Sequence, residues 1–194
     1  MTGRAAVKRS PLAGMALPEG LREVPFLAQV DLRAEPGDAA LLERFALALG
    51  HPLPLDPNTA CGREGQHALW LGPDEWLLVG AEGTEATLEA RCRAALGTAL
   101  GSVVDVSANR TTLELSGPAA RSVLETACSL DLHPRTFAAG RCAQTLLARI
   151  PVILHQLTGE PRYHILVRPS FAIHLATWLR DAWAGVGIAA PPLQ

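Results

Sequence analysis

The sequence predicts an α+β fold of two tandem ferredoxin-like βαββαβ units, whose antiparallel sheets are covered by helices on one side. Three observations support this prediction. Alternating apolar and polar residues mark half-buried strands, apolar residues at helical spacing mark amphipathic helices, and the same order of patterns occurs twice in 194 residues. We expect a flexible arm over 1–22 and a single domain over 23–194, with pseudo-repeats at about 26–108 and 109–190.

The first unit begins with a strand at 26–33, where four apolar residues alternate with polar ones. A helix follows, because Asp38 is a suitable N-cap, apolar residues recur at helical spacing, and Gly50 can end it. Residues 52–66 contain three prolines and two glycines without periodicity. They are predicted to form a surface loop.

A β-hairpin is predicted at 69–79, where two apolar runs flank Gly72-Pro73-Asp74-Glu75. Proline presets a turn φ and glycine tolerates unusual backbone angles, so these four residues favour a tight turn. Each arm carries one tryptophan, Trp70 or Trp76. The simplest interpretation is a core hairpin, and a partner contact through either tryptophan is the alternative.

The first unit is predicted to end with a helix and a strand. Thr84 is a plausible N-cap, and Leu88, Cys92, Leu96 and Leu100 recur at four-residue spacing. This spacing indicates that Cys92 is a core residue rather than a nucleophile. The β-branched run at 103–106 supplies the closing strand.

The second unit begins with an alternating strand at 111–116 and a helix with Pro118 at its first position. The inward stripe of this helix is predicted to be Ala120, Val123, Leu124, Ala127 and Cys128. Strands are then expected at 143–150 and 152–157, separated by Pro151.

The second unit continues with a turn at 158–161 and a strand at 162–167. Ser170 is the predicted N-cap of the last helix, and 186–189 is the predicted closing strand. The inward face of that helix is expected to comprise Phe171, His174, Leu175, Trp178, Leu179 and Ala182.

Composition and charge argue against several classes of function. The formal net charge is −2 at pH 7 and the arginines are scattered, so the chain lacks the basic field of a nucleic-acid-binding protein. No apolar run reaches the length of a signal or membrane-spanning segment, so no membrane association is expected. Four cysteines without a C-x-x-C pair indicate reduced thiols and a cytoplasmic protein. The mean hydropathy of +0.17 indicates that another subunit covers some apolar surface.

Common catalytic signatures are missing from the sequence, including those of phosphate loops, dinucleotide-binding folds, zincins and serine hydrolases. Lys8 is the only lysine and lies in the predicted arm, which argues against Schiff-base chemistry. The six histidines never fall at i, i+2 or i+4 from one another, so no single element offers a metal-binding pair. Distant histidines can still converge in space.

Polar residues gather at two places. Asp105, Asn109 and Arg110 lie at the junction of the two units, whereas His133 and Arg135 follow the third helix. Burying a carboxylate is costly unless it is paired, so Asp105 either caps a turn or faces a cavity, and capping is favoured. The arginines can bind a carboxylate, form intersubunit ion pairs or simply remain exposed.

Four segments resemble the gamma subunit of bacterial heterotetrameric sarcosine oxidase. They are WLGPDEWLLV at 70–79, DVSANRTTLELSGPAARSVL from Asp105, SLDLHP from Ser129 and GRCAQTLLARIPVILHQL from Gly140. Three more segments, RSPLAGMAL, QVDLR and LVRPSF, extend the resemblance over nearly the whole chain. Residues 105–124 also resemble the folate-binding domain of glycine-cleavage aminomethyltransferases.

The resemblance implies an aminomethyltransferase-like fold in a small subunit of a complex that oxidises sarcosine to glycine. The one-carbon unit passes to tetrahydrofolate or leaves as formaldehyde, and hydrogen peroxide is formed. FAD, FMN, NAD, zinc and tetrahydrofolate are expected in the other subunits, chiefly the large alpha subunit against which this chain packs. No catalytic or metal-binding residue is carried over from the resemblance.

Two alternatives remain open. One is a stand-alone folate-binding or aminomethyltransferase-like domain with Asp105, Asn109, Arg110 and Arg135 around a pocket. The other is an α+β domain with an unrelated partner. If the chain is instead a subunit of the sarcosine-oxidising complex, the expected partner contacts are Trp70, Trp76, His133 and the junction residues.

Overall fold

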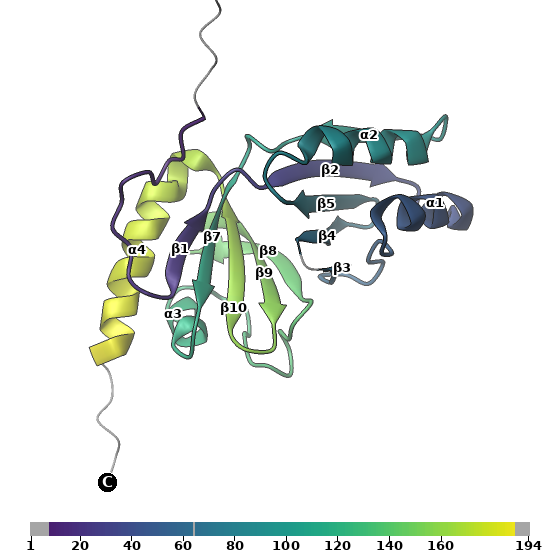
Figure 1. Ribbon diagram of the computed structural model, residues 1–194. Coiled ribbons are helices and arrows are strands. Elements are labelled where there is room, and N and C mark those ends of the chain that lie inside the picture. The colour runs from purple at the N-terminus through teal and green to yellow at the C-terminus, as the bar shows by residue number, and fades with distance from the viewer. Residues whose placement is uncertain (1–7, 64, 189–194) are drawn as a thin grey trace, which may run out of the picture.

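The protein is built from two antiparallel sheets that pack through their inner faces and carry helices on their outer faces (Figure 1). The computed structural model describes residues 8–63 and 65–188. Three apolar clusters hold the layers together, one under each pair of helices and one between the sheets. The predicted α+β class, with helices on one side of each sheet, is confirmed.

The first unit has the predicted βαββαβ order with one additional strand. Its elements are β2 (Ala28–Ala34), α1 (Ala39–Leu49), β3 (Ala60–Arg63), β4 (Gln66–Gly72), β5 (Glu75–Gly80), α2 (Glu85–Leu96) and β6 (Gly101–Asp105). The strand order is β3-β4-β5-β2-β6. The predicted loop at 52–66 is therefore wrong in part, since β3 pairs with β4 along its whole length.

The second unit has the same layout. Its elements are β7 (Thr111–Ser116), α3 (Ala120–Glu125), β8 (Cys142–Leu147), β9 (Ile150–Thr158), β10 (Arg162–Val167) and α4 (Pro169–Ile188). With β1 (Leu21–Val24), its strand order is β1-β7-β10-β9-β8, which matches the first sheet strand for strand. The predicted pseudo-repeat is thus visible in the topology, including the extra strands β3 and β8.

The strand that closes the second sheet comes from the start of the chain. β1 pairs with β7 in antiparallel register from Leu21 opposite Leu115 to Val24 opposite Thr112. The predicted closing strand at 186–189 is wrong, because α4 continues through Ile188; Ala189 lies outside the described residues. The expected boundary at 22/23 falls inside β1, and Leu12 farther upstream is buried in the core. Among the described residues, the folded part therefore begins earlier than predicted.

Capping interactions explain where α1 begins and where it ends. The Asp38 carboxylate accepts a hydrogen bond from the Leu41 backbone N–H at 2.9 Å. At the other end, Gly50 adopts a left-handed φ of 80° and donates its N–H to the Ala46 carbonyl. Both predicted caps are confirmed.

Three other predictions of element ends are wrong. Leu100 lies beyond α2 and is 92% exposed, because Gly97 ends the helix. Pro118 precedes α3 and its N-cap Ala119, rather than occupying the first helical position. Ser170 lies inside α4, which starts at Pro169.

The strands β8 and β9 form a hairpin whose turn was also misplaced in the prediction. Ala148 and Arg149 connect them, and both have positive φ, as two-residue hairpin turns with matching twist require. Pro151 lies within β9, where it is exposed and opposite Leu146 of the edge strand β8. Pairing of β9 with β10 reaches only Val152, so Pro151 has a strand on one side alone, and a proline is tolerated at such a position.

The α3 and α4 stripes are confirmed in part. Ala120, Val123 and Leu124 are buried, whereas Ala127 and Cys128 follow α3 and are partly buried. In α4 the buried residues are Ala172, Leu175, Ala176 and Leu179, while Phe171 and His174 are exposed. The buried face therefore includes the small side chains of Ala172 and Ala176, which fit between the helix and the sheet, instead of Phe171 and His174.

Candidate functional site

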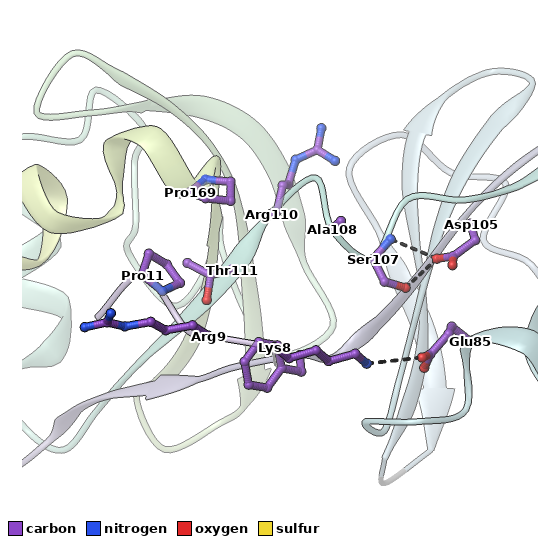
Figure 2. A pocket seen from close by; sticks show the side chains of 11 residues that line it. Lys8, Arg9, Pro11, Glu85, Asp105, Ser107, Ala108, Arg110, Thr111 and Pro169 are labelled. Atoms are coloured by element: carbon purple, nitrogen blue, oxygen red, sulfur yellow. Dashed lines mark hydrogen bonds and ion pairs between the residues drawn. The ribbon is translucent and has the colours of Figure 1, made fainter. Parts of the chain in front are cut away.

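A first cavity lies at the junction of the two units and is called here the junction pocket (Figure 2). It has a volume of about 430 Å³ and is lined by residues that include Lys8, Arg9, Glu85, Asp105 and Arg110. The N-terminal segment thus forms one wall and the connection between β6 and β7 forms another. Lys8 lies 3.4 Å from the Glu85 carboxylate at the start of α2.

Within the junction pocket, Asp105 caps a turn. One of its carboxylate oxygens accepts hydrogen bonds from the Ser107 backbone N–H at 2.9 Å and from the Ser107 hydroxyl at 2.5 Å. The turn-capping interpretation is confirmed, and the same side chain also lines a cavity. Burial lowers the pKa of Arg110, as does the nearby Arg168, while Asp31 and Glu75 oppose this shift. The Arg110 side chain extends away from Lys8 in Figure 2.

The remaining predicted polar residues lie outside the lining of the junction pocket. The amide oxygen of Asn109 accepts a hydrogen bond from Arg168 at 3.1 Å. His133 and Arg135 lie in an exposed turn, in which Asp131 accepts a hydrogen bond from the His133 backbone N–H at 2.9 Å. That hydrogen bond, followed by one from Thr136, lowers the pKa of Asp131. The folate-binding alternative placed Asn109 and Arg135 around one pocket with Asp105 and Arg110, but neither Asn109 nor Arg135 lines the junction pocket.

The two tryptophans of the predicted hairpin are direct cross-strand partners with different exposure. Trp76 is 0% exposed and lies in the core beneath α1 and α2, where its indole N–H donates to the Pro54 carbonyl at 2.7 Å. Trp70 is only half-buried. The hairpin prediction is confirmed, and Trp76 is the tryptophan that points into the domain.

A second cavity, called here the intersheet cleft, was not predicted. It has a volume of about 500 Å³ and is lined by strands from both sheets. Its polar wall is a row of side chains that crosses four neighbouring strands, formed by Arg22 of β1, Glu114 of β7, His164 of β10 and His155 of β9. From the other sheet, His67 meets His155 edge-on, with ring centroids 5.1 Å apart. Histidines distant in sequence therefore do converge.

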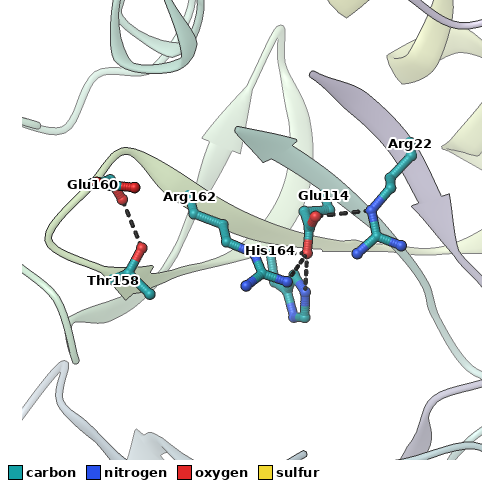
Figure 3. Close-up of polar contacts among 6 residues, drawn as sticks. All are labelled: Arg22, Glu114, Thr158, Glu160, Arg162 and His164. Carbon is teal, nitrogen blue, oxygen red and sulfur yellow. Dashed lines mark hydrogen bonds and ion pairs between the residues drawn. The ribbon is translucent and has the colours of Figure 1, made fainter. Parts of the chain in front are cut away.

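Glu114 is the centre of this row (Figure 3). One carboxylate oxygen accepts from Arg22 Nε at 2.8 Å, and the other accepts from Arg162 Nη2 at 2.8 Å and lies 3.3 Å from His164 Nε2. Burial alone would raise the pKa of Glu114, but hydrogen bonds from Arg22 and Arg162 outweigh it and hold the pKa below its usual value. The carboxylate is therefore ionised and saturated with donors.

The two histidines of the row are held neutral. Burial is the main cause that lowers the pKa of His155 to about 3, and His67 and His164 add to it. Burial also lowers the pKa of His164 to about 4, although Glu114 acts in the opposite direction. Burial and then His51 lower the pKa of His67. At neutral pH the cleft thus contains neutral imidazoles beside an ionised carboxylate and two guanidinium groups.

The neutral histidines predict that acid destabilises the fold. His155 binds a proton near pH 6.5 when the chain is unfolded but only near pH 3 when it is folded, so stability is lost as pH falls between these values. At pH 5 the loss from His155 is about 2 kcal/mol, and His164 adds to it. Glu114, whose pKa is lowered in the fold, adds a further loss at lower pH, because its carboxylate then binds a proton in the unfolded chain before it does so in the folded one. Denaturant unfolding at pH 7 and pH 5 measures the difference.

The matched variants for this measurement are His155→Gln and His174→Gln. The first removes the buried imidazole, so its stability should fall about 2 kcal/mol less between pH 7 and pH 5 than that of the parent chain. His174 is exposed on α4 and does not line the cleft, so His174→Gln controls for the loss of a histidine elsewhere in the chain. An equal pH dependence in the parent chain and His155→Gln would contradict the assignment.

Two further structural findings bear on function. Across residues 8–63 and 65–188, no group of three or more His, Cys, Asp or Glu side chains is arranged to hold a metal ion. In the same part of the chain, none of the helices is both long and apolar enough to span a membrane.

Sequence comparisons find close relatives. Residues 33–185 match the sequence model of the sarcosine oxidase, gamma subunit family. The chain is 46% identical over 187 residues to the sarcosine oxidase subunit gamma of Corynebacterium sp. (strain P-1), covering 91% of this chain and 90% of that one. It is 48% identical over 163 residues to the subunit gamma of Arthrobacter sp., covering 84% and 78%.

Structural comparison agrees with the sequence. The fold is similar to a chain of the heterotetrameric sarcosine oxidase from Corynebacterium sp. U-96, with a TM-score of 0.85 and 41% identity over 95% of this chain and 99% of that one. Glycine cleavage system aminomethyltransferase T from Bartonella henselae gives a TM-score of 0.64 at 17% identity, covering 82% of this chain and 45% of that one. The second match shows a shared fold.

Proposed function

Because this chain belongs to the sarcosine oxidase gamma subunit family, we propose that it is the structural and assembly subunit of a heterotetrameric sarcosine oxidase and supplies no catalytic residue. The observation that carries this proposal is the extent of the match, which covers 99% of a chain from a solved heterotetramer. The complex would oxidise sarcosine with O₂ to glycine and hydrogen peroxide. Its one-carbon unit would leave as formaldehyde with uptake of water, or as methylene-tetrahydrofolate.

The state of the ionisable groups supports a role without catalysis. General acid–base catalysis works best when the pKa of the group is near the working pH. In the intersheet cleft, burial brings the pKa values of His155 and His164 to about 3 and about 4, and Glu114 is saturated by its arginine partners. In the junction pocket, Asp105 is engaged by Ser107. Glu114 and Asp105 are thus engaged in hydrogen bonds within the chain, and the two histidines are poor proton acceptors at neutral pH.

Partner binding is supported by apolar side chains on the surface. Leu47, Leu100 and Ile173 are each more than half exposed, although they belong to a chain with apolar clusters that bury most such residues. In our proposal the large alpha subunit is the chief partner in the cytoplasm. FAD, FMN, NAD, zinc and tetrahydrofolate belong to the other subunits of the complex.

Co-expression with the other three subunits tests the assembly role. We expect the chain to co-elute with flavin-containing large chains, and we expect its omission to lower the yield of assembled complex. Activity per flavin in whatever complex still forms should be unchanged, because this chain supplies no catalytic group. A stable, fully active complex obtained in undiminished yield without the chain would refute the proposal.

The alternative is a folate-binding domain that acts alone, and the junction pocket with Asp105 and Arg110 is the observation that favours it. Titrating the purified chain with a reduced folate separates the two functions. Saturable micromolar binding, worth about −8 kcal/mol, would favour the alternative. Lack of saturable binding would favour the assembly role.

A further inference from the structure

The intersheet cleft has the size and the composition of a small-molecule site. Its volume of about 500 Å³ lies within the range of roughly 300 to 1,000 Å³ that is typical of ligand pockets. Most such pockets combine apolar walls with a few convergent polar groups. The cleft has both, and its walls come from both units of the chain.

The guanidinium groups in the cleft have hydrogen-bonding capacity left. An arginine side chain carries five N–H donors, and Arg22 uses only Nε on Glu114 while Arg162 uses Nε and Nη2. Two arginines and one ionised carboxylate leave the polar wall with a net positive charge. Glu114 already accepts hydrogen bonds from both arginines. The N–H groups of Arg22 and Arg162 that remain unused can therefore donate to an anion.

His155 supplies a second, independent sign of a ligand. Its side chain is 3% exposed and lines the cleft, yet its imidazole makes no hydrogen bond within the part of the chain that the structure describes. Its ring nitrogens are therefore available to a ligand in the cleft. A neutral imidazole has one donor and one acceptor, so it can pair with a polar atom of that ligand.

The cleft also has apolar walls. Leu69 and Val79 come from one sheet, and Leu157 and Leu166 come from the other. Leu69, Val79 and Leu166 belong to the packed apolar cluster between the sheets, so the cleft borders this cluster. An apolar part of a ligand would pack against that border.

We propose that the intersheet cleft binds a small monocarboxylate, with its carboxylate on Arg22 and Arg162 and its apolar part against Leu157 and Leu166. A polar atom on this part of the ligand would pair with His155. Zwitterionic amino acids are disfavoured, because the carboxylate that would receive their ammonium group is already saturated. This site goes beyond the assembly role, and its ligand binds whether or not the subunit supports assembly.

Benzoate is the probe that tests this site, and benzamide is its uncharged counterpart. Titration of the full-length chain labelled with ¹³C-histidine should shift the imidazole resonances of His155 and His67 saturably with benzoate. Binding of benzamide should be at least tenfold weaker, because the charge-assisted hydrogen bonds to the arginines are lost. Absence of a saturable shift, or equal affinity for the two compounds, would overturn the proposal.

Arginine variants locate the binding. Arg162→Gln should weaken benzoate binding about tenfold or more, while Arg162→Lys, which keeps the charge, should retain part of the affinity. Arg168→Gln is the matched control, because Arg168 contacts Asn109 at the unit junction and does not line the cleft. Should Arg162→Gln fail to fold, the comparison of benzoate with benzamide on the parent chain still decides the question. Unchanged affinity in a folded Arg162→Gln variant would refute this location.

Discussion

Replacing Trp76 with alanine is expected to lower the free energy of unfolding by about 4 kcal/mol, the cost typical of deleting a buried large aromatic side chain. Trp76 is among the largest fully buried side chains of the protein and packs in the cluster beneath α1 and α2. Its loss also leaves the Pro54 carbonyl without its indole donor. Denaturant unfolding followed by circular dichroism measures the change.

Trp70→Ala is the matched control for this experiment. Trp70 lies directly opposite Trp76 on the same hairpin but is half-buried. Its replacement should cost roughly 1 to 2 kcal/mol, because less apolar surface returns to water and no cavity forms inside the core. Equal losses for the two variants would show that the hairpin, rather than the buried indole, sets the stability.

Glu114→Gln is expected to cost about 2 to 3 kcal/mol, because the change removes the one negative charge between Arg22 and Arg162. Breaking a fully buried ion pair costs about 3 to 5 kcal/mol. The side chains of the two arginines are 60% and 45% exposed, so water compensates part of the loss. Because Arg22 belongs to β1, the amides of that strand should also exchange hydrogen faster.

Glu75→Gln applies the same substitution to a surface pair. Glu75 accepts from Arg33 at 2.6 Å at the hairpin end of the first sheet, where both side chains are partly in water. Such pairs contribute about 0 to 1 kcal/mol, so this variant should unfold almost like the parent chain. If Glu75→Gln were as destabilising as Glu114→Gln, burial would not explain the importance of Glu114.

Helix α1 and the β4–β5 hairpin, whose signals are local, were predicted correctly. Asp38 and Gly50 define both ends of α1 through hydrogen bonds within a few residues, and the Gly72-Pro73 turn joins two strands that are adjacent in sequence. The βαββαβ order of the first unit, apart from β3, also follows from its pattern. In these cases the physical cause of the structure is contained in a short stretch of chain.

Elements that depend on a distant partner were missed. β1 is four residues long and β3 has no clean alternation, so each is a strand only because another strand pairs with it. The face of α4 was misjudged because Ala172 and Ala176 carry little weight in an apolar pattern, although their small size permits close packing. These features are decided by tertiary contacts rather than by local preference.

The candidate sites show the same difference between features with a local signal and features that depend on distant contacts. Asp105 and Arg110 line one pocket, as their nearness in sequence suggests. The intersheet cleft escaped prediction because Glu114 alternates with Leu113 and Leu115, and in a sheet with one solvated face such a residue points to water. Here the second sheet covers that face, so Glu114 is buried.

β1 precedes the first unit in the sequence but belongs to the sheet of the second unit, and this affects the order in which the two sheets can form during translation. The first unit, from β2 to β6, is complete once its own segment has emerged, whereas the strand that closes the second unit is made before the other strands of its sheet. Arg22 and its partner Glu114 lie 92 residues apart, so at about 5 to 20 residues per second the nascent β1 waits roughly 5 to 20 s for β7. The second sheet is therefore left open while the whole first unit is made, and its closure joins two segments that lie on either side of that unit in the sequence.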